Sequence, residues 1–375
     1  MRYLLAGNGL NLQFDSKNYS PKQLVLRVLK NCNRDDFPKH IIVDRPHLLQ
    51  NYIAQLFLEG RKALIGEYDR YALNTAEKQS LKSFKERYGP NRCSLRITDI
   101  GFEDYYLLHD LVCHRHDMVN PEQYQIREAM RIAYLHAIYN DGALCELYRN
   151  FPSAFIEYLR KFDSIFTTNY DSNIESATGM EVYHLHGQFD RLDEVYDASS
   201  LRNALPDAPI KDAKIDPSYF YLYSTALSTY CGAYKEFQIK QAPRSNKMVA
   251  DMSEKYQVDP EFRNIVDNMT KDSNHLTANM GYAIQAKAAN PTLRFTNDYH
   301  IEEFQHINGT LEVIGLSASN DDHIFGAIDQ SDITGCIYYY HGKESICAVE
   351  KLLSGLTSTN RLKFISVKEF WEKYA

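Results

Sequence analysis

Short apolar runs separated by long helical stretches constrain the fold of this chain more than any other feature. Such runs lie at residues 3–7, 164–168, 182–185, 311–315, 336–340 and 362–366. Continuous apolar runs of this length are typical of strands with both faces buried, and helical connections allow neighbouring strands to be parallel. The sequence therefore predicts an α/β fold with a Rossmann-like, doubly wound parallel sheet.

Helical periodicity fills much of the chain between the first two runs. Apolar residues recur at helical spacing from Leu48 to Phe57 and from Ile126 to Ala137, as on the buried face of an amphipathic helix. A further helix is expected at residues 345–353, after the fifth run. Residues 85–92, with Gly89 and Pro90, are interpreted as a solvated loop.

These patterns predict two parts of the chain. Residues 1–189 and 309–375 would form a nucleotide-binding domain that carries a helical segment at about residues 20–160. Residues 190–308 are polar and rich in proline, and we interpret them as a mainly helical insertion. An aromatic cluster in this insertion could pack in a core or line a cleft or partner surface; its members are Tyr219, Phe220, Tyr221, Tyr223, Tyr230 and Tyr234.

Composition excludes several classes of protein. The 375 residues are 44% hydrophobic and 24% charged, which is enough material for a large core. A formal net charge of -7 gives no general reason to bind nucleic acid. The apolar runs are far shorter than the roughly 20 residues of a membrane span, and Asn8 and Asn11 interrupt the first run before it could form a signal peptide. We expect a cytoplasmic protein with no membrane partner.

The seven cysteines form no C-x-x-C pair, and we interpret them as reduced, buried thiols. The segment from Cys113 to His116 is the nearest approach to a metal-binding cluster. It lacks a second ligand group at suitable spacing, so ordinary polar histidines on a helix or loop are the favoured interpretation. The sequence predicts no metal site.

A glycine pair follows the first apolar run. Gly7 and Gly9 would let backbone amides approach a pyrophosphate, and the positive end of the following helix would assist. A plain strand-to-helix turn is the alternative. The dinucleotide fingerprint G-x-G-x-x-G requires a third glycine where this chain has Leu12, which disfavours an ordinary NAD dehydrogenase.

Polar residues follow the second and third runs. Thr168 and Asn169 end the second run, and the Asn169 amide could orient a ribose hydroxyl or a water, whereas Asp171 could simply cap a helix. His186, followed by Gly187, ends the third run and could act as a base. His184 lies two residues earlier, and spacing alone does not choose between the two histidines.

The order of a Gly-x-Gly loop, a T-x-N-x-D segment, a His-Gly pair and a late G-x-S segment resembles the sirtuin superfamily, particularly its zinc-free, prokaryotic sirtuin-like NADases. This resemblance implies that Asn169 and His186 are the catalytic pair. The late segment is residues 315–322, and the resemblance implies that Gly315 and Ser317 contact the adenosine side of NAD.

The loop from Gly7 to Asn11 is closer to the G-N-G-x-x-L opening of the abortive-infection H family, which also resembles a sirtuin-related group. The combined resemblance implies a set of NAD-binding residues in addition to the catalytic pair. They are Gly7, Asn8, Gly9, Asn11, Thr168, Asp171, Gly187, Gly315 and Ser317.

The resemblance implies an NAD+ glycohydrolase that releases nicotinamide and ADP-ribose, with water as the acceptor and with no zinc or cofactor beyond NAD+ as substrate. It further implies an antiphage, abortive-infection effector, expected to be a homo-oligomer triggered by a companion protein such as a HerA-like ATPase. The alternative is a catalytically idle subunit that binds NAD or ADP-ribose. A nuclease or phosphatase is disfavoured because Asp321 and Asp322 are better explained as a helix start.

Overall fold

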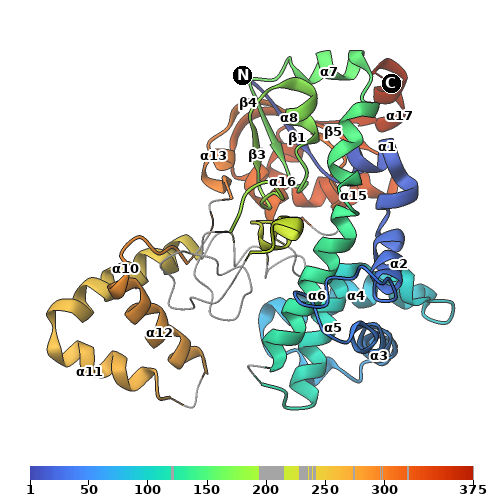
Figure 1. The fold of residues 1–375 in the computed structure, drawn as a ribbon. Helices are drawn as coiled ribbons and strands as arrows, with labels where there is room; N and C mark the ends of the chain where they lie inside the picture. The colour runs from blue at the N-terminus through green and yellow to red at the C-terminus, as the bar shows by residue number, and fades with distance from the viewer. Residues whose placement is uncertain are drawn as a thin grey trace.

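The computed structural model describes residues 1–119, 122–193, 215–227, 235, 239, 242–272, 275–295, 297, 299–318 and 321–374. A six-stranded, all-parallel sheet in the order β3-β2-β1-β4-β5-β6 forms its centre (Figure 1). The strands are β1 (Arg2–Ala6), β2 (Ser164–Thr167), β3 (Val182–His184), β4 (Asn308–Ile314), β5 (Asp332–Tyr340) and β6 (Leu362–Ser366). This confirms the predicted α/β class, and each predicted run overlaps a strand.

Both faces of the sheet are buried, because successive side chains of each strand point to opposite sides. On one face, Leu5 and Val313 pack against α13 (Ile301–Gln305), α14 (Asp322–Asp329), α15 (Glu344–Leu352) and α16 (Ser354–Ser358). On the other face, Leu4 and Ile314 pack against α1 (Gly9–Tyr19), α7 (Ser153–Leu159), α8 (Asn173–Thr178) and α17 (Val367–Tyr374). Burial on both faces explains why the strands are apolar throughout.

The chain reverses its direction of travel across the sheet between β1 and β4. From β1 it proceeds to β2 and β3 on one side, and then returns to β4, β5 and β6 on the other. Ala6 is in register with Thr167 of β2 and with Ile314 of β4, so these strands end at one level. In open parallel sheets such a reversal opens a crevice beyond the carboxyl ends of the strands, where ligands bind.

Three glycines allow the turns after β1 and β4 to touch through their main chains. The Gly7 amide donates to Ile314 O at 2.8 Å, and the Gly9 amide donates to Gly315 O at 2.8 Å. A Cβ on Gly7 would lie 2.6 Å from Gly315 O, and one on Gly9 would lie 2.5 Å from the Cα of Gly315. Gly315 itself has a φ of +73°. No larger residue fits this contact without moving the main chain.

The segment between β1 and β2 is largely helical, as predicted, and its helices from α2 to α6 lie beyond the carboxyl ends of the strands (Figure 1). They share one core around Leu56, Leu108 and Tyr134. Residues 85–92, expected to be a loop, instead continue a helix to Tyr88 and then form a short 3-10 turn, because Phe84 is fully buried and Tyr88 packs on its ring. The helices are α2 (Pro21–Asn31), α3 (Pro46–Leu64), α4 (Thr75–Tyr88), α5 (Phe102–Arg115) and α6 (Glu122–Tyr139).

The described part of the chain between β3 and α13 is also helical. Helices α10 (Ala242–Val258), α11 (Pro260–Met269) and α12 (His275–Ala289) enclose a small core of Val249, Val266 and Ile284, and they project away from the sheet (Figure 1). In the aromatic cluster, Tyr221 and Tyr223 are buried in the core of the first helical segment, so core packing is the role that the structure shows for them. Tyr230 and Tyr234 lie outside the described residues.

The cysteines are only partly as expected. Cys32, Cys113 and Cys336 are buried free thiols, whereas Cys93 and Cys347 are exposed, because they lie outside the apolar faces of their segments. Cys231 lies outside the described residues. None of the helices in the described ranges combines the length and apolar composition that a membrane span requires.

The glycine contact generates a stability prediction. Gly7→Ala should lower the free energy of unfolding by about 1–3 kcal/mol, because its Cβ would overlap the main chain of Gly315. Gly326→Ala in α14 is the matched control: a Cβ there meets nothing within 4 Å, and the change should be neutral or stabilise by up to about 1 kcal/mol. Urea unfolding of both variants measures the difference, and equal stability would contradict the predicted overlap.

Candidate active site

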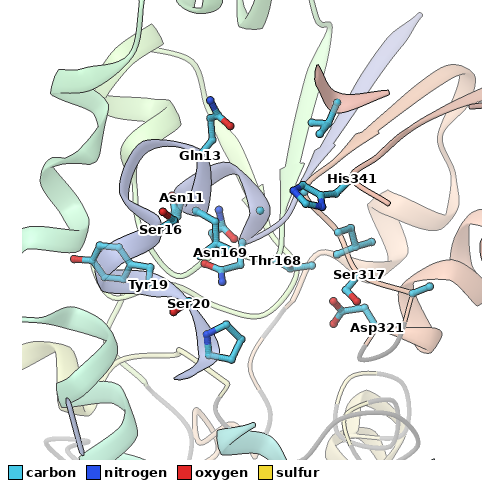
Figure 2. A pocket seen from close by; sticks show the side chains of 18 of the residues that line it. Asn11, Gln13, Ser16, Tyr19, Ser20, Thr168, Asn169, Ser317, Asp321 and His341 are labelled. Atoms are coloured by element: carbon cyan, nitrogen blue, oxygen red, sulfur yellow. The ribbon is translucent and has the colours of Figure 1, made fainter. Parts of the chain in front are cut away.

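A cavity of about 780 Å³ lies at the carboxyl ends of the central strands. The turns after β1, β2, β4 and β5 line it, and residues of α2, α5 and α6 contribute to its wall. Figure 2 shows Asn11 and Asn169 next to each other on one side, with Ser317, Asp321 and His341 on the other. The cavity therefore occupies the crevice that the reversal between β1 and β4 predicts.

The structure brings most of the predicted site residues to this one cavity. Those that line it are Asn8, Gly9, Asn11, Thr168, Asn169, Asp171, His186, Gly315 and Ser317. Gly7 lies behind the turn, where it contacts Gly315, and Gly187 is pressed against the carbonyl oxygen of Thr225 with a φ of +74°. Ser319 and Asn320 of the late segment lie outside the described residues.

The role expected for the glycine amides differs from what the structure shows. The amides of Gly7 and Gly9 already donate to main-chain carbonyls of the β4 turn, so their hydrogens are used within the fold. Because Gly7 and Gly9 have no side chains, the main chain after β1 can pack closely against the main chain after β4. Polar groups that face the cavity from this turn come instead from Asn8 and Asn11.

Asn169 is held at the end of β2 by its neighbours in the sheet. Its backbone amide donates to Thr167 Oγ1 at 3.1 Å, and that hydroxyl in turn donates to Ala6 O at 3.0 Å. The side-chain Nδ2 lies 3.4 Å from Gly7 O, a long hydrogen bond that orients the carboxamide. The residue is 7% exposed. The Asn169 side chain is therefore oriented by the ends of both β1 and β2.

The two histidines that strand spacing could not distinguish have different surroundings. Strand β3 ends at His184, whose ring nitrogens contact Asn169 O at 2.9 Å and Glu175 Oε1 at 2.7 Å. Burial on its own lowers the pKa of His184, but the hydrogen bond and charge of Glu175 raise it above the ordinary value. Both nitrogens are engaged in holding the Asn169 loop, and His184 does not line the cavity; His186 does.

A buried polar chain supports the turn after β1. Asn11 Nδ2 donates to Asp171 Oδ2 at 2.7 Å, and Asp171 Oδ1 accepts from Asn173 Nδ2 at 2.6 Å. Burial raises the pKa of Asp171, and the hydrogen bonds from the two asparagines oppose that rise. Asn11 Oδ1 is buried, and no donor of the described residues reaches it. Asn11 thus lines the cavity while its Oδ1 stays buried without a partner among the described residues.

His186 contacts a second histidine. Its Nε2 lies 2.9 Å from Nε2 of His323, the two rings are stacked at 5.1 Å, and each residue is 3% exposed. Burial, the charge of Lys235 and the neighbouring His323 together hold the pKa of His186 well below its ordinary value. Its imidazole is therefore neutral and able to accept a proton or bind a cation.

Sequence reasoning missed three charged residues at this site. Lys235 donates to Glu103 at 2.7 Å, and both line the cavity with Asp321. Burial lowers the pKa of Lys235, but the charges of Glu103 and Asp321 raise it above the ordinary value, so the amine stays charged. Burial raises the pKa of Asp321 to about 7. Glu103 lies in α5, between β1 and β2, and Lys235 lies between β3 and α13. No sequence motif includes either residue.

The possible metal ligands also differ from the sequence-based candidate. Cys113 contacts His109 and Met118, and His114 contacts Tyr71 O, so that segment does not converge on one point. Within the part of the chain that the structure describes, the group with metal-ligand geometry is His186, Asp321 and His323, whose ligand atoms lie within 4.8 Å of one another. His323 directly follows the late G-x-S segment in the sequence, and this position was the only sequence signal that could have identified it as a site residue.

Comparison of the chain with protein-family models, with curated proteins and with solved structures finds no match. Inference about function therefore depends on the residues and geometry of the cavity, together with the resemblance of the motifs.

The buried polar chain generates a second prediction. Asp171→Ala would leave the Asn11 and Asn173 amides without their acceptor, at a cost of about 1–3 kcal/mol for each unpaired donor. The exposed Asp190, which accepts from Ser172, is the control: Asp190→Ala should change stability by no more than about 0.5 kcal/mol. Thermal unfolding of both variants gives the comparison, and a wild-type melting temperature for Asp171→Ala would refute the structural role.

Proposed function

We propose that the protein is an NAD+ glycohydrolase that cleaves the nicotinamide-ribose bond. The observation that carries the proposal is that Asn169 and His186, 17 positions apart and on different strand ends, line one cavity at the reversal of the sheet. The resemblance of the motifs to sirtuin-like NADases independently assigns the same two residues to catalysis.

The cavity has features that suit a dinucleotide. Its volume of about 780 Å³ falls in the upper part of the range of about 300–1,000 Å³ found for ligand pockets. Asn8 and Ser317 bring polar side chains to its lining, where ligand hydroxyls could bind. Trp371 and Tyr339 are also among its lining residues and supply aromatic surface of the kind on which a base can stack.

The chemistry requires little from the protein beyond positioning. The bond between C1′ of the ribose and the ring nitrogen breaks, and its electron pair neutralises the pyridinium, so nicotinamide leaves without needing an acid. Water bonds to C1′ and releases one proton. The ribose passes through an oxocarbenium-like state, as in glycoside cleavage generally, and a shielded cavity that holds the ribose and the water lowers the barrier.

Asn169 and His186 supply the two remaining requirements. The Asn169 carboxamide orients the ribose or the attacking water. His186 accepts a proton from a ribose hydroxyl, as its neutral imidazole allows. When its Nε2–H donates to His323, the lone pair of His186 is on Nδ1, which makes Nδ1 the basic nitrogen. His323 would then set the tautomer of the base.

We further propose that this activity serves antiphage defence by depleting NAD+. Unregulated NAD+ hydrolysis would poison the host cell, so the activity requires an off state. A homo-oligomer and a companion protein, for which a HerA-like ATPase is one example, would supply the trigger. These elements of the proposal rest on the resemblance of the motifs.

The proposal is tested by the two catalytic candidates. His186→Ala and Asn169→Ala should each lower the rate of nicotinamide release by at least about 100-fold, because loss of a general base typically costs 10²–10⁴. Purified protein is incubated with NAD+, alone and with the products of neighbouring genes, and nicotinamide and ADP-ribose are separated by chromatography. Circular dichroism verifies that each variant is folded.

His306→Ala is the control for this experiment. His306 is exposed and precedes β4, so it lies at the amino ends of the strands, whereas the cavity lies at their carboxyl ends. Its rate should equal that of the wild type. Full turnover by His186→Ala would reject the assignment of the base. Tight binding of NAD+ or ADP-ribose by a wild-type chain that releases no nicotinamide under any condition would instead favour the idle binding subunit.

A further inference from the structure

We propose that His186, Asp321 and His323 form a binding site for a transition-metal dication, for which Zn²⁺ is the probe. The site lies in the wall of the cavity, and its residues come from the turn after β3 and the start of α14. Imidazole nitrogen with one carboxylate oxygen is a donor set that such ions favour.

The distances suit three ligands of one ion. Nε2 of His186 lies 2.9 Å from Nε2 of His323 and 3.9 Å from Oδ1 of Asp321. With metal-ligand bonds of about 2.0–2.2 Å, adjacent ligand atoms stand about 3–3.5 Å apart, so shifts of about 1 Å would bring these three atoms, now within 4.8 Å of one another, to that spacing. Two of the three ligands, His186 and Asp321, also line the cavity.

The charges around the site are compatible with a cation. Both histidines are 3% exposed, and the nearby positive charge of Lys235 is compensated by Glu103 at 2.7 Å. Asp321 offers a carboxyl group that a bound cation would hold deprotonated. Two imidazole nitrogens that face each other at 2.9 Å need a proton or a cation between them, because two lone pairs would repel.

A bound metal ion would remove the base of the proposed reaction, and this consequence rests on the proposed function. A metal on Nε2 of His186 leaves the ring's only proton on Nδ1, so neither nitrogen keeps a lone pair to accept a proton. The contact between the two histidines therefore holds either a proton, which leaves Nδ1 basic, or a metal ion, which removes the base. Metal binding and NAD+ cleavage exclude each other, which provides one form of the required off state.

Metal binding is tested without NAD+. The full chain is treated with EDTA, desalted and titrated with ZnCl₂ in a calorimeter, and bound zinc is counted by mass spectrometry after a second desalting. We expect one Zn²⁺ per chain. His323→Ala and Asp321→Asn should weaken binding by more than about 100-fold, because even loss of a residue behind a ligand typically costs 10- to 100-fold.

His341→Ala is the matched control, since His341 lines the same cavity but is not one of the three ligands. It should bind zinc like the wild type. Absence of zinc from the wild type, or wild-type binding by both ligand variants, would overturn the metal site. Thermal unfolding of each variant verifies that weakened binding does not come from a loss of folding.

The mutual exclusion of metal binding and NAD+ cleavage is tested by measuring nicotinamide release in the presence of ZnCl₂ or of EDTA. Zinc should stop release by the wild type, EDTA should restore it, and Asp321→Asn, which keeps the histidine pair, should resist zinc. Unchanged release by the zinc-loaded wild type would overturn the exclusion. Because the binding titration uses no NAD+, it decides the metal site even where the proposed hydrolysis fails.

Discussion

The contact between the main chains of the β1 and β4 turns is the constraint on which the rest of the site depends. Gly7 and Gly9 approach Gly315 so closely that no Cβ fits between them. This contact sets the position of the turn that carries Asn11, and it places Gly7 O where the Asn169 amide reaches it. The cavity is thus the space that remains after two strand ends have packed against each other.

Buried polar residues divide into those that hold the site and those that face it. His184 and Asp171 use their polar atoms on neighbouring loops: His184 contacts Asn169 O and Glu175, and Asp171 accepts from Asn11 and Asn173. A buried network of this kind is rigid, because breaking any member leaves another group unpaired. The cavity-facing groups of Asn169 and His186 are therefore presented by a preorganised support.

The sequence predicted the strands well and the electrostatics of the site poorly. Apolar runs reveal strands buried on both faces, and the register of parallel strands then brings the residues after β1, β2 and β4 to one edge. Lys235, between β3 and α13, and Glu103 of α5 are adjacent only because their two segments meet at the carboxyl ends of the strands. Residues 85–92 were misjudged because the buried ring of Phe84 outweighs the turn signals that follow it.

By itself the sequence determined the order of apolar and helical segments, and with it the parallel sheet and the edge where polar residues gather. Strand alternation left His184 and His186 as equal candidates, because it is a local property, and the resemblance of the motifs favoured His186. Only the tertiary structure shows how differently the two are placed: β3 ends at His184, whose ring nitrogens contact Asn169 and Glu175, whereas the chain turns after it and His186 meets His323. Burial, partners and charge depend on contacts between distant segments, which local sequence patterns do not encode.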